Sequence, residues 1–202
     1  MADRVPLDFD PQVRQIRALL LGVDESDLTG PTPCPGWPVA ALLDHLMGLS
    51  YAFAQGARKR DGGPASEPSA DHLSRHWRSR LPVLLEELSV AWRDPAAWAG
   101  TATVGGVTLP ATDMGIFGMN ELVIHGWDLA RATGQDYAAD PRALEVLIDF
   151  LSQGPADGTP GLFGPFVPVD SEDDALLQAV GLTGRDPAWR PPRRKAPAAQ
   201  RR

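Results

Sequence analysis

Two ionisable side chains four positions apart stand out in residues 120–130, a segment that is otherwise rich in apolar residues. If the segment is helical, Glu121 and His125 lie about 40° apart on one face, since an α-helix turns about 100° per residue. The remainder of that face is largely apolar, and Asp128 lies at its edge. The spacing therefore places an acid and an imidazole on a core-facing stripe.

A third group of this kind is His45, which lies directly over Leu42 and Leu49 if residues 38–60 are helical. An isolated carboxylate or imidazole in an apolar core costs several kcal/mol unless it is paired or bound to a metal. Two histidines and one carboxylate suit Zn²⁺, Ni²⁺ or Fe²⁺, and three protein ligands leave a coordination position for water or substrate, as in catalytic sites. We therefore predict a divalent metal held by His45, Glu121 and His125.

The same residues allow a purely structural interpretation. Glu121 and His125 could form a hydrogen-bonded pair, with His45 as a satisfied core histidine. A competing i,i+4 pair, His72 and His76, falls outside the apolar arc of its predicted helix, so these residues are expected to face solvent or its border. The His45 set is favoured because its members come from two separate apolar faces.

Other residues with reactive or binding side chains carry weaker signals. Cys34 stands between prolines with no histidine near it in sequence, so an inert loop cysteine is favoured over a nucleophile. Asp128 and Arg131 could orient a cofactor at a pocket mouth, although a surface ion pair is the favoured alternative. We interpret Trp37 and Trp127 as packing residues.

The elements that must position these groups are mostly helical. Amphipathic 3.6-residue periods separated by Pro and Gly predict helices at residues 10–22, 38–60, 69–92, 112–132, 140–150 and 171–180. Pro82 predicts a kink in the third. Residues with β-propensity around Gly105-Gly106 predict a small hairpin within residues 98–110. The pattern predicts an all-α four-helix bundle over residues 8–154, a short C-terminal helical extension over 155–190 that packs on it, and a disordered Pro/Arg tail over 191–202.

Composition narrows the function classes. The chain has 202 residues, a net charge of −7 and one cysteine, which excludes an internal disulfide and a cysteine-based zinc finger. Before position 185 there are 12 basic against 25 acidic residues, which argues against a nucleic-acid surface. No stretch approaches the ~20 apolar residues of a membrane span, and the first residues lack a signal-peptide pattern. We therefore expect a cytoplasmic protein without membrane or nucleic-acid partners.

Four motifs together resemble the mycothiol-dependent maleylpyruvate isomerase N-terminal/DinB-like family, in particular its short metal-binding branch. They are Thr32-Pro-Cys-Pro-Gly-Trp37, Leu43-Asp-His-Leu46, the block from Asn120 to Gly134, and Gly184-Arg-Asp-Pro187. The resemblance covers roughly residues 8–189. It implies a DinB-like four-helix bundle whose divalent metal, commonly zinc, is bound by the residues matching His45, Glu121 and His125.

The resemblance also implies a cofactor and a chemistry. Better-studied relatives use thiols such as mycothiol, whose metal-bound thiolate serves in isomerisation or S-transfer on a small electrophile. The isomerase has a substantial additional C-terminal domain, whereas here few ordered residues follow Pro160, which argues against maleylpyruvate itself as substrate. Phe163-Gly-Pro-Phe166 and the terminal helix are expected to cover the open end of the bundle. A thiol-dependent enzyme and a non-catalytic metal- or ligand-binding module both stay open, as does a homodimer.

Overall fold

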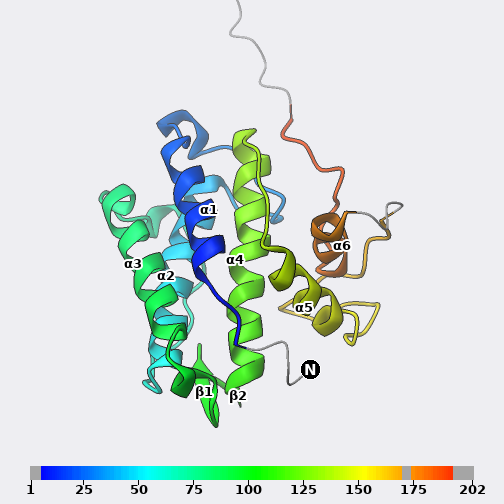
Figure 1. Cartoon of the computed structure of the whole chain (residues 1–202). Helices are drawn as coiled ribbons and strands as arrows, with labels where there is room; N and C mark the ends of the chain where they lie inside the picture. Colours follow the sequence, from blue (N-terminus) through cyan, green and yellow to red (C-terminus); the bar gives the residue numbers. More distant parts are fainter. Residues whose placement is uncertain (1–5, 170–173, 193–202) are drawn as a thin grey trace, which may run out of the picture.

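The computed structural model describes residues 6–169 and 174–192, and four long helices dominate it (Figure 1). The helices are α1 (Asp10–Leu21), α2 (Val39–Ala57), α3 (Trp77–Trp92), α4 (Ala111–Thr133), α5 (Pro141–Leu151) and α6 (Ala175–Leu182). Short 3₁₀ turns lie at Glu25–Asp27, Ala70–His72 and Pro95–Trp98, and the strands are β1 (Thr101–Val104) and β2 (Val107–Pro110). The predicted all-α class with one small hairpin is confirmed.

The bundle is formed by α1 to α4. Helix α2 packs against α3 and α4, and α1 packs against the same two helices, so α1 and α2 lie diagonally across the bundle. The buried core between them combines leucines from all four helices with valine, isoleucine, methionine and tryptophan side chains, and Phe9 stacks on Trp92 at a ring-centroid distance of 5.7 Å. This packing brings the inward face of α2 opposite that of α4, where the predicted metal ligands lie.

Local signals explain where several elements begin and end. Asp140 caps α5 by accepting a hydrogen bond from the Ala143 amide at 3.0 Å, and Gly134 ends α4 in the left-handed region at φ 70°. Gly105 and Gly106 both have positive φ, which a two-residue hairpin turn of this kind requires. Strand β1 pairs with β2 antiparallel, with Val104 opposite Val107.

One predicted boundary is wrong. The third helix begins at Trp77 rather than after Pro68, and α3 then continues through Pro82. The capping signal at Ser69 is used by the 3₁₀ turn, where the Ser69 hydroxyl accepts a hydrogen bond from the Asp71 amide. The Ser69 amide in turn donates to Asp44 on α2 at 3.2 Å, so this segment is held against α2 before α3 starts.

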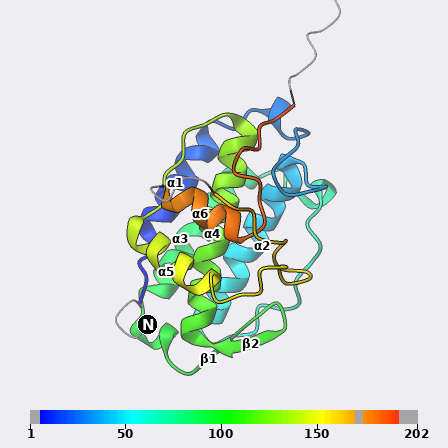
Figure 2. The same ribbon diagram turned by 90° about the vertical axis from the view of Figure 1, so that its right-hand side faces the viewer.

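The C-terminal helices lie beside the bundle (Figure 2). Helix α5 contacts α4, and α6 packs on α5. In the loop that joins them, Phe163 stacks on Phe117 of α4 at 6.5 Å. The predicted start of the last helix, at residues 171–173, and the tail from 193 lie outside the described residues, and α6 is described from Ala175. Among the helices described, none combines the length and apolarity that crossing a bilayer requires.

Candidate metal centre

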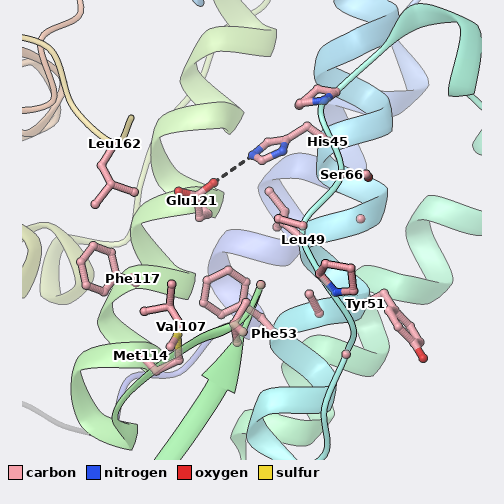
Figure 3. Close-up of a pocket in the computed structure, with 18 of the residues that line it drawn as sticks. His45, Leu49, Tyr51, Phe53, Ser66, Val107, Met114, Phe117, Glu121 and Leu162 are labelled. Atoms are coloured by element: carbon pink, nitrogen blue, oxygen red, sulfur yellow. Dashed lines mark hydrogen bonds and ion pairs between the residues drawn. The ribbon is translucent and has the colours of Figure 1, made fainter. Parts of the chain in front are cut away.

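Three side chains from two helices converge inside the bundle. His45 of α2 places Nε2 at 3.0 Å from Oε2 of Glu121, and Nε2 of His125 lies 3.2 Å from the same oxygen. The three possible ligand atoms all lie within 4.8 Å of one another. Figure 3 shows His45 reaching from α2 toward Glu121 on α4. The structure thus brings together the three residues that the sequence predicts as metal ligands.

Trp37 fixes the two imidazoles from one side. Its ring centroid lies 5.0 Å from that of His45 and 5.9 Å from that of His125. The loop that carries Trp37 closes on itself, because the Thr32 hydroxyl donates to the Trp37 carbonyl at 2.9 Å and Gly36 takes a positive φ. Trp37 is therefore a packing residue, and what it packs against is the candidate centre itself.

A second layer of polar groups lies behind His125. Its Nδ1 is 2.9 Å from Oδ2 of Asp128, a fully buried carboxylate. Arg185, which follows α6, donates to Asp128 through Nε at 3.3 Å and through Nη2 at 3.1 Å. The Cys34 thiol is 3.1 Å from Oδ2 of Asp128 and 3.8 Å from Nδ1 of His125. The C-terminal extension thus contributes a cation directly behind the centre.

The electrostatics of the cluster follow from burial and pairing. Burial alone would raise the pKa of the Glu121 carboxyl, but hydrogen bonds from His125 and His45 outweigh it and hold that pKa far below its usual value. Burial alone would lower the pKa of His125, yet its hydrogen bonds to Asp128, Cys34 and Glu121 raise it well above the usual value. Without a metal, the site therefore binds a proton on His125 beside an ionised Glu121.

Asp128 and Arg185 form the compensating pair. Burial acts to raise the pKa of Asp128, but the Arg185 charge and the His125 hydrogen bond lower it, so Asp128 is ionised. Cys34, His125 and Asp128 also lie close enough together to be considered as metal ligands. That alternative set is disfavoured, because the Arg185 guanidinium already lies 3.4 Å from the Cys34 sulfur and 3.1 Å from Asp128 and would repel a second cation.

The structure separates Asp128 from Arg131. Asp128 is buried and pairs with Arg185, so the predicted surface ion pair between Asp128 and Arg131 is wrong. Arg131 instead lies over the ring of the buried Trp127, 5.3 Å from its centroid. The contacts of Asp128 and Arg131 do not bear on cofactor binding, so the assignment of these two residues as cofactor-orienting groups stays a prediction.

Two residues of this layer were not identified from the sequence. Cys34 lies in a loop, as expected, but its side chain is buried beside His125, and Arg185 carries a sequence signal only as part of the Gly184-Arg-Asp-Pro187 motif. The competing pair, His72 and His76, is exposed, and His72 lies 4.0 Å from Asp44 rather than in the cluster.

A cavity of about 500 Å³ opens beside the cluster, and both His45 and Glu121 line it. The two side chains each keep 24% of their surface exposed, whereas His125, behind them, keeps 8%. Figure 3 shows His45 and Glu121 at one end of this cavity, with apolar side chains such as Leu49, Phe53 and Met114 along the rest. A small molecule in this cavity can therefore reach the side chains of His45 and Glu121.

Comparisons with known proteins identify the fold and the family of the chain. Two uncharacterized proteins of Mycobacterium tuberculosis, MT0763 of strain CDC 1551 / Oshkosh and Rv0738 of strain ATCC 25618 / H37Rv, are each 26% identical over 155 residues, which is 77% of this chain and 80% of theirs. The crystal structure of the mycothiol-dependent maleylpyruvate isomerase shares the fold at a TM-score of 0.54 and 20% identity, over 73% of this chain and 71% of that chain.

A histidine-to-alanine mutant of the same isomerase gives the same TM-score of 0.54, over 74% of this chain and 71% of that chain. The family model described as "Mycothiol maleylpyruvate isomerase N-terminal domain" matches residues 9–130. That range is more than half of the chain and contains His45, Glu121 and His125. The chain therefore belongs to the mycothiol maleylpyruvate isomerase N-terminal domain family.

Proposed function

We propose that this protein is a divalent-metal-dependent enzyme that uses a low-molecular-weight thiol of the mycothiol type to isomerise, or transfer sulfur to, a small electrophile. The observation that carries the proposal is the convergence of His45, Glu121 and His125 at the end of a cavity that a small molecule can enter. The family to which the chain belongs supports a thiol as cosubstrate.

The chemistry of the donor set fits a metal ion. Two imidazole nitrogens and one carboxylate oxygen are the ligands of many catalytic zinc sites, which keep a further position open. A histidine that binds a metal through one ring nitrogen usually forms a hydrogen bond to a carboxylate through the other. In His125, Nε2 faces Glu121 and Nδ1 lies 2.9 Å from the Asp128 carboxylate. Zinc is the ion that we favour, with nickel and iron as alternatives that the same ligands accept.

A bound divalent cation would lower the pKa of a coordinated thiol, so that the sulfur is nucleophilic at neutral pH. The residues of this chain provide the surroundings for that chemistry. Asp128 accepts a hydrogen bond from Nδ1–H of His125 and thereby leaves the Nε2 lone pair for the cation. Arg185 keeps Asp128 ionised, and the wall of the cavity beside the cluster is predominantly apolar.

The alternative proposal is a non-catalytic metal- or ligand-binding module. It would be favoured by a metal that substrates cannot reach. His45 and Glu121 line the cavity instead, which supports the enzyme over the binding module. The purely structural alternative predicts that His45→Leu is tolerated or even stabilising, because removing an unneeded polar group from a core can be neutral.

The test is an assay of zinc-loaded protein with mycothiol and a panel of small electrophiles, with thiol consumption and thiol binding as separate readouts. We expect thiol-dependent turnover that Glu121→Gln abolishes and that Glu86→Gln, an exposed control on α3, leaves unchanged. If zinc-loaded protein neither binds the thiol nor turns over any electrophile, the proposal is wrong.

A further inference from the structure

We propose that the cavity beside the candidate metal centre selects an uncharged electrophile with an apolar body, and that it disfavours a dicarboxylate such as maleylpyruvate. This inference rests on the proposed function for its chemistry, but the selectivity itself is a property of the cavity walls. We assign Leu162, in the loop between α5 and α6, to the outer wall of the cavity, the side that it shares with a second cavity.

The walls of the cavity are predominantly apolar. Helices α2 and α4, the hairpin and the loop after α5 all contribute to it (Figure 3). Its large apolar side chains include Leu49, Phe53, Val107, Met114, Phe117 and Leu162. A volume of about 500 Å³ accommodates a drug-sized molecule, and walls of this kind favour burial of a hydrocarbon body.

The charges on the walls are of the wrong sign for an anionic substrate. Among the described residues that line the cavity there is no lysine or arginine, and two acidic residues, Asp44 and Glu121, both line it. A metal bound by His45 and Glu121 could compensate one carboxylate of a substrate at that end only. A second carboxylate would lie against apolar walls without a cationic partner, which opposes its binding.

The outer wall separates this cavity from a second one of about 510 Å³. Phe117 and Leu162 line both cavities, so they form the partition between them. Phe117 is held by its edge-on contact with Phe150, at a ring-centroid distance of 5.1 Å. Leu162 is 62% exposed and is carried by a turn in which its amide donates to the Thr159 carbonyl at 2.9 Å. The less constrained Leu162 therefore determines how long a ligand fits.

The test compares methyl cinnamate with cinnamate, which share an aromatic body and an electrophilic double bond and differ in charge. Affinities are measured by calorimetry and by ligand-detected NMR on the full chain, both zinc-loaded and metal-free. We expect the metal-free chain to bind the ester more than about tenfold more tightly than the anion, because the anion lacks a cationic partner in the cavity. With zinc, which attracts carboxylate, the preference should shrink but persist.

Two substitutions at exposed positions test the walls without disturbing the core. Val107→Arg places a cation at the cavity and should strengthen cinnamate binding several-fold, whereas Val90→Arg, a control of similar exposure on α3, should not. Leu162→Ala should weaken binding of the ester several-fold, whereas Leu21→Ala, at an exposed position on α1 outside the cavity, should leave it unchanged. Circular dichroism checks that each variant is folded.

The outcomes separate this inference from the proposed function. If zinc does not bind but the metal-free chain prefers the ester in a Leu162-dependent manner, the enzyme proposal fails and the cavity assignment stands. If zinc binds but cinnamate binds as tightly as its ester, or neither ligand binds in either metal state, the cavity assignment is overturned. A Val107→Arg variant that binds cinnamate no better than Val90→Arg also overturns it.

Discussion

Replacing Arg185 with methionine should destabilise the whole bundle, although Arg185 follows the last described helix. Arg185 donates three hydrogen bonds of 3.1 to 3.3 Å to the Asp128 carboxylate, which has no exposed surface. Arg185→Met removes the cation and leaves that carboxylate buried, at a similar side-chain length. Breaking a buried ion pair from one side typically costs 3–5 kcal/mol of the free energy of unfolding.

The expected magnitude lies at the low end of that range. His125 stays 2.9 Å from Asp128 and, with its raised pKa, supplies a partial replacement charge in the metal-free protein. We therefore expect Arg185→Met to lower the free energy of unfolding by about 3 kcal/mol. In an Asp128→Asn background the same change should cost about 1 kcal/mol or less, because the carboxylate that needed the cation is already gone, so the coupling is about 2 kcal/mol.

The assay is urea unfolding of metal-free protein at pH 7, followed by circular dichroism, for the two single variants and the double variant. Arg17→Met is the control, because Arg17 forms a 3.1 Å pair with Glu86 in which both side chains are nearly half exposed. Such a surface pair contributes 0–1 kcal/mol. The reasoning fails if Arg185→Met costs no more than Arg17→Met, or if the effects of Arg185→Met and Asp128→Asn simply add.

Three further outcomes are expected. The zinc content of the protein, measured between pH 8 and 5, should fall as the pH falls. The loss should begin above pH 6.5, because the raised pKa of His125 lets protons compete with zinc for this side chain. A zinc content that stays unchanged down to pH 5 would contradict histidine ligation. Without metal the sign reverses for His125: the stability that it contributes is complete below 6.5 and decreases as the pH rises through its raised pKa, which unfolding at pH 6 and 9 would detect. Gly126→Ala should lower the free energy of unfolding by about 1–3 kcal/mol, because the new Cβ would lie 2.7 Å from Cζ of Tyr137. Gly48→Ala is the control and should be neutral or stabilising, because no atom lies within 4 Å of the Cβ that it adds. Equal effects of the two substitutions would contradict the packing argument.

Periodicity and the cost of buried polar groups predicted the bundle and its three converging residues. Both are local signals: a period of 3.6 residues identifies the buried face of a helix, and His45, Glu121 and His125 each interrupt such a face. Facing helices must then bring these groups together. Capping signals alone did not predict where the third helix begins, because Ser69 caps a 3₁₀ turn that a tertiary hydrogen bond to Asp44 holds in place.

The layer behind His125 could not be predicted in the same way. The contact between Cys34 and Asp128 joins residues 94 positions apart, and that between Arg185 and Asp128 joins residues 57 apart. Neither Cys34 nor Arg185 interrupts a helical apolar face, so neither carries a periodic signal. The sequence places Asp128 at the edge of its helix face, but only the position of the C-terminal extension shows that Arg185 is the cation that compensates its charge.

The most direct test of the account is the metal content per chain, measured by mass spectrometry on untagged protein. We predict about one divalent ion per chain in the parent, its loss in His45→Ala and in Glu121→Ala, and its retention in His76→Ala, which removes an exposed histidine outside the cluster. A parent protein that binds no metal after reconstitution with zinc, nickel or iron would contradict the account, as would a Glu121→Ala variant that keeps its metal.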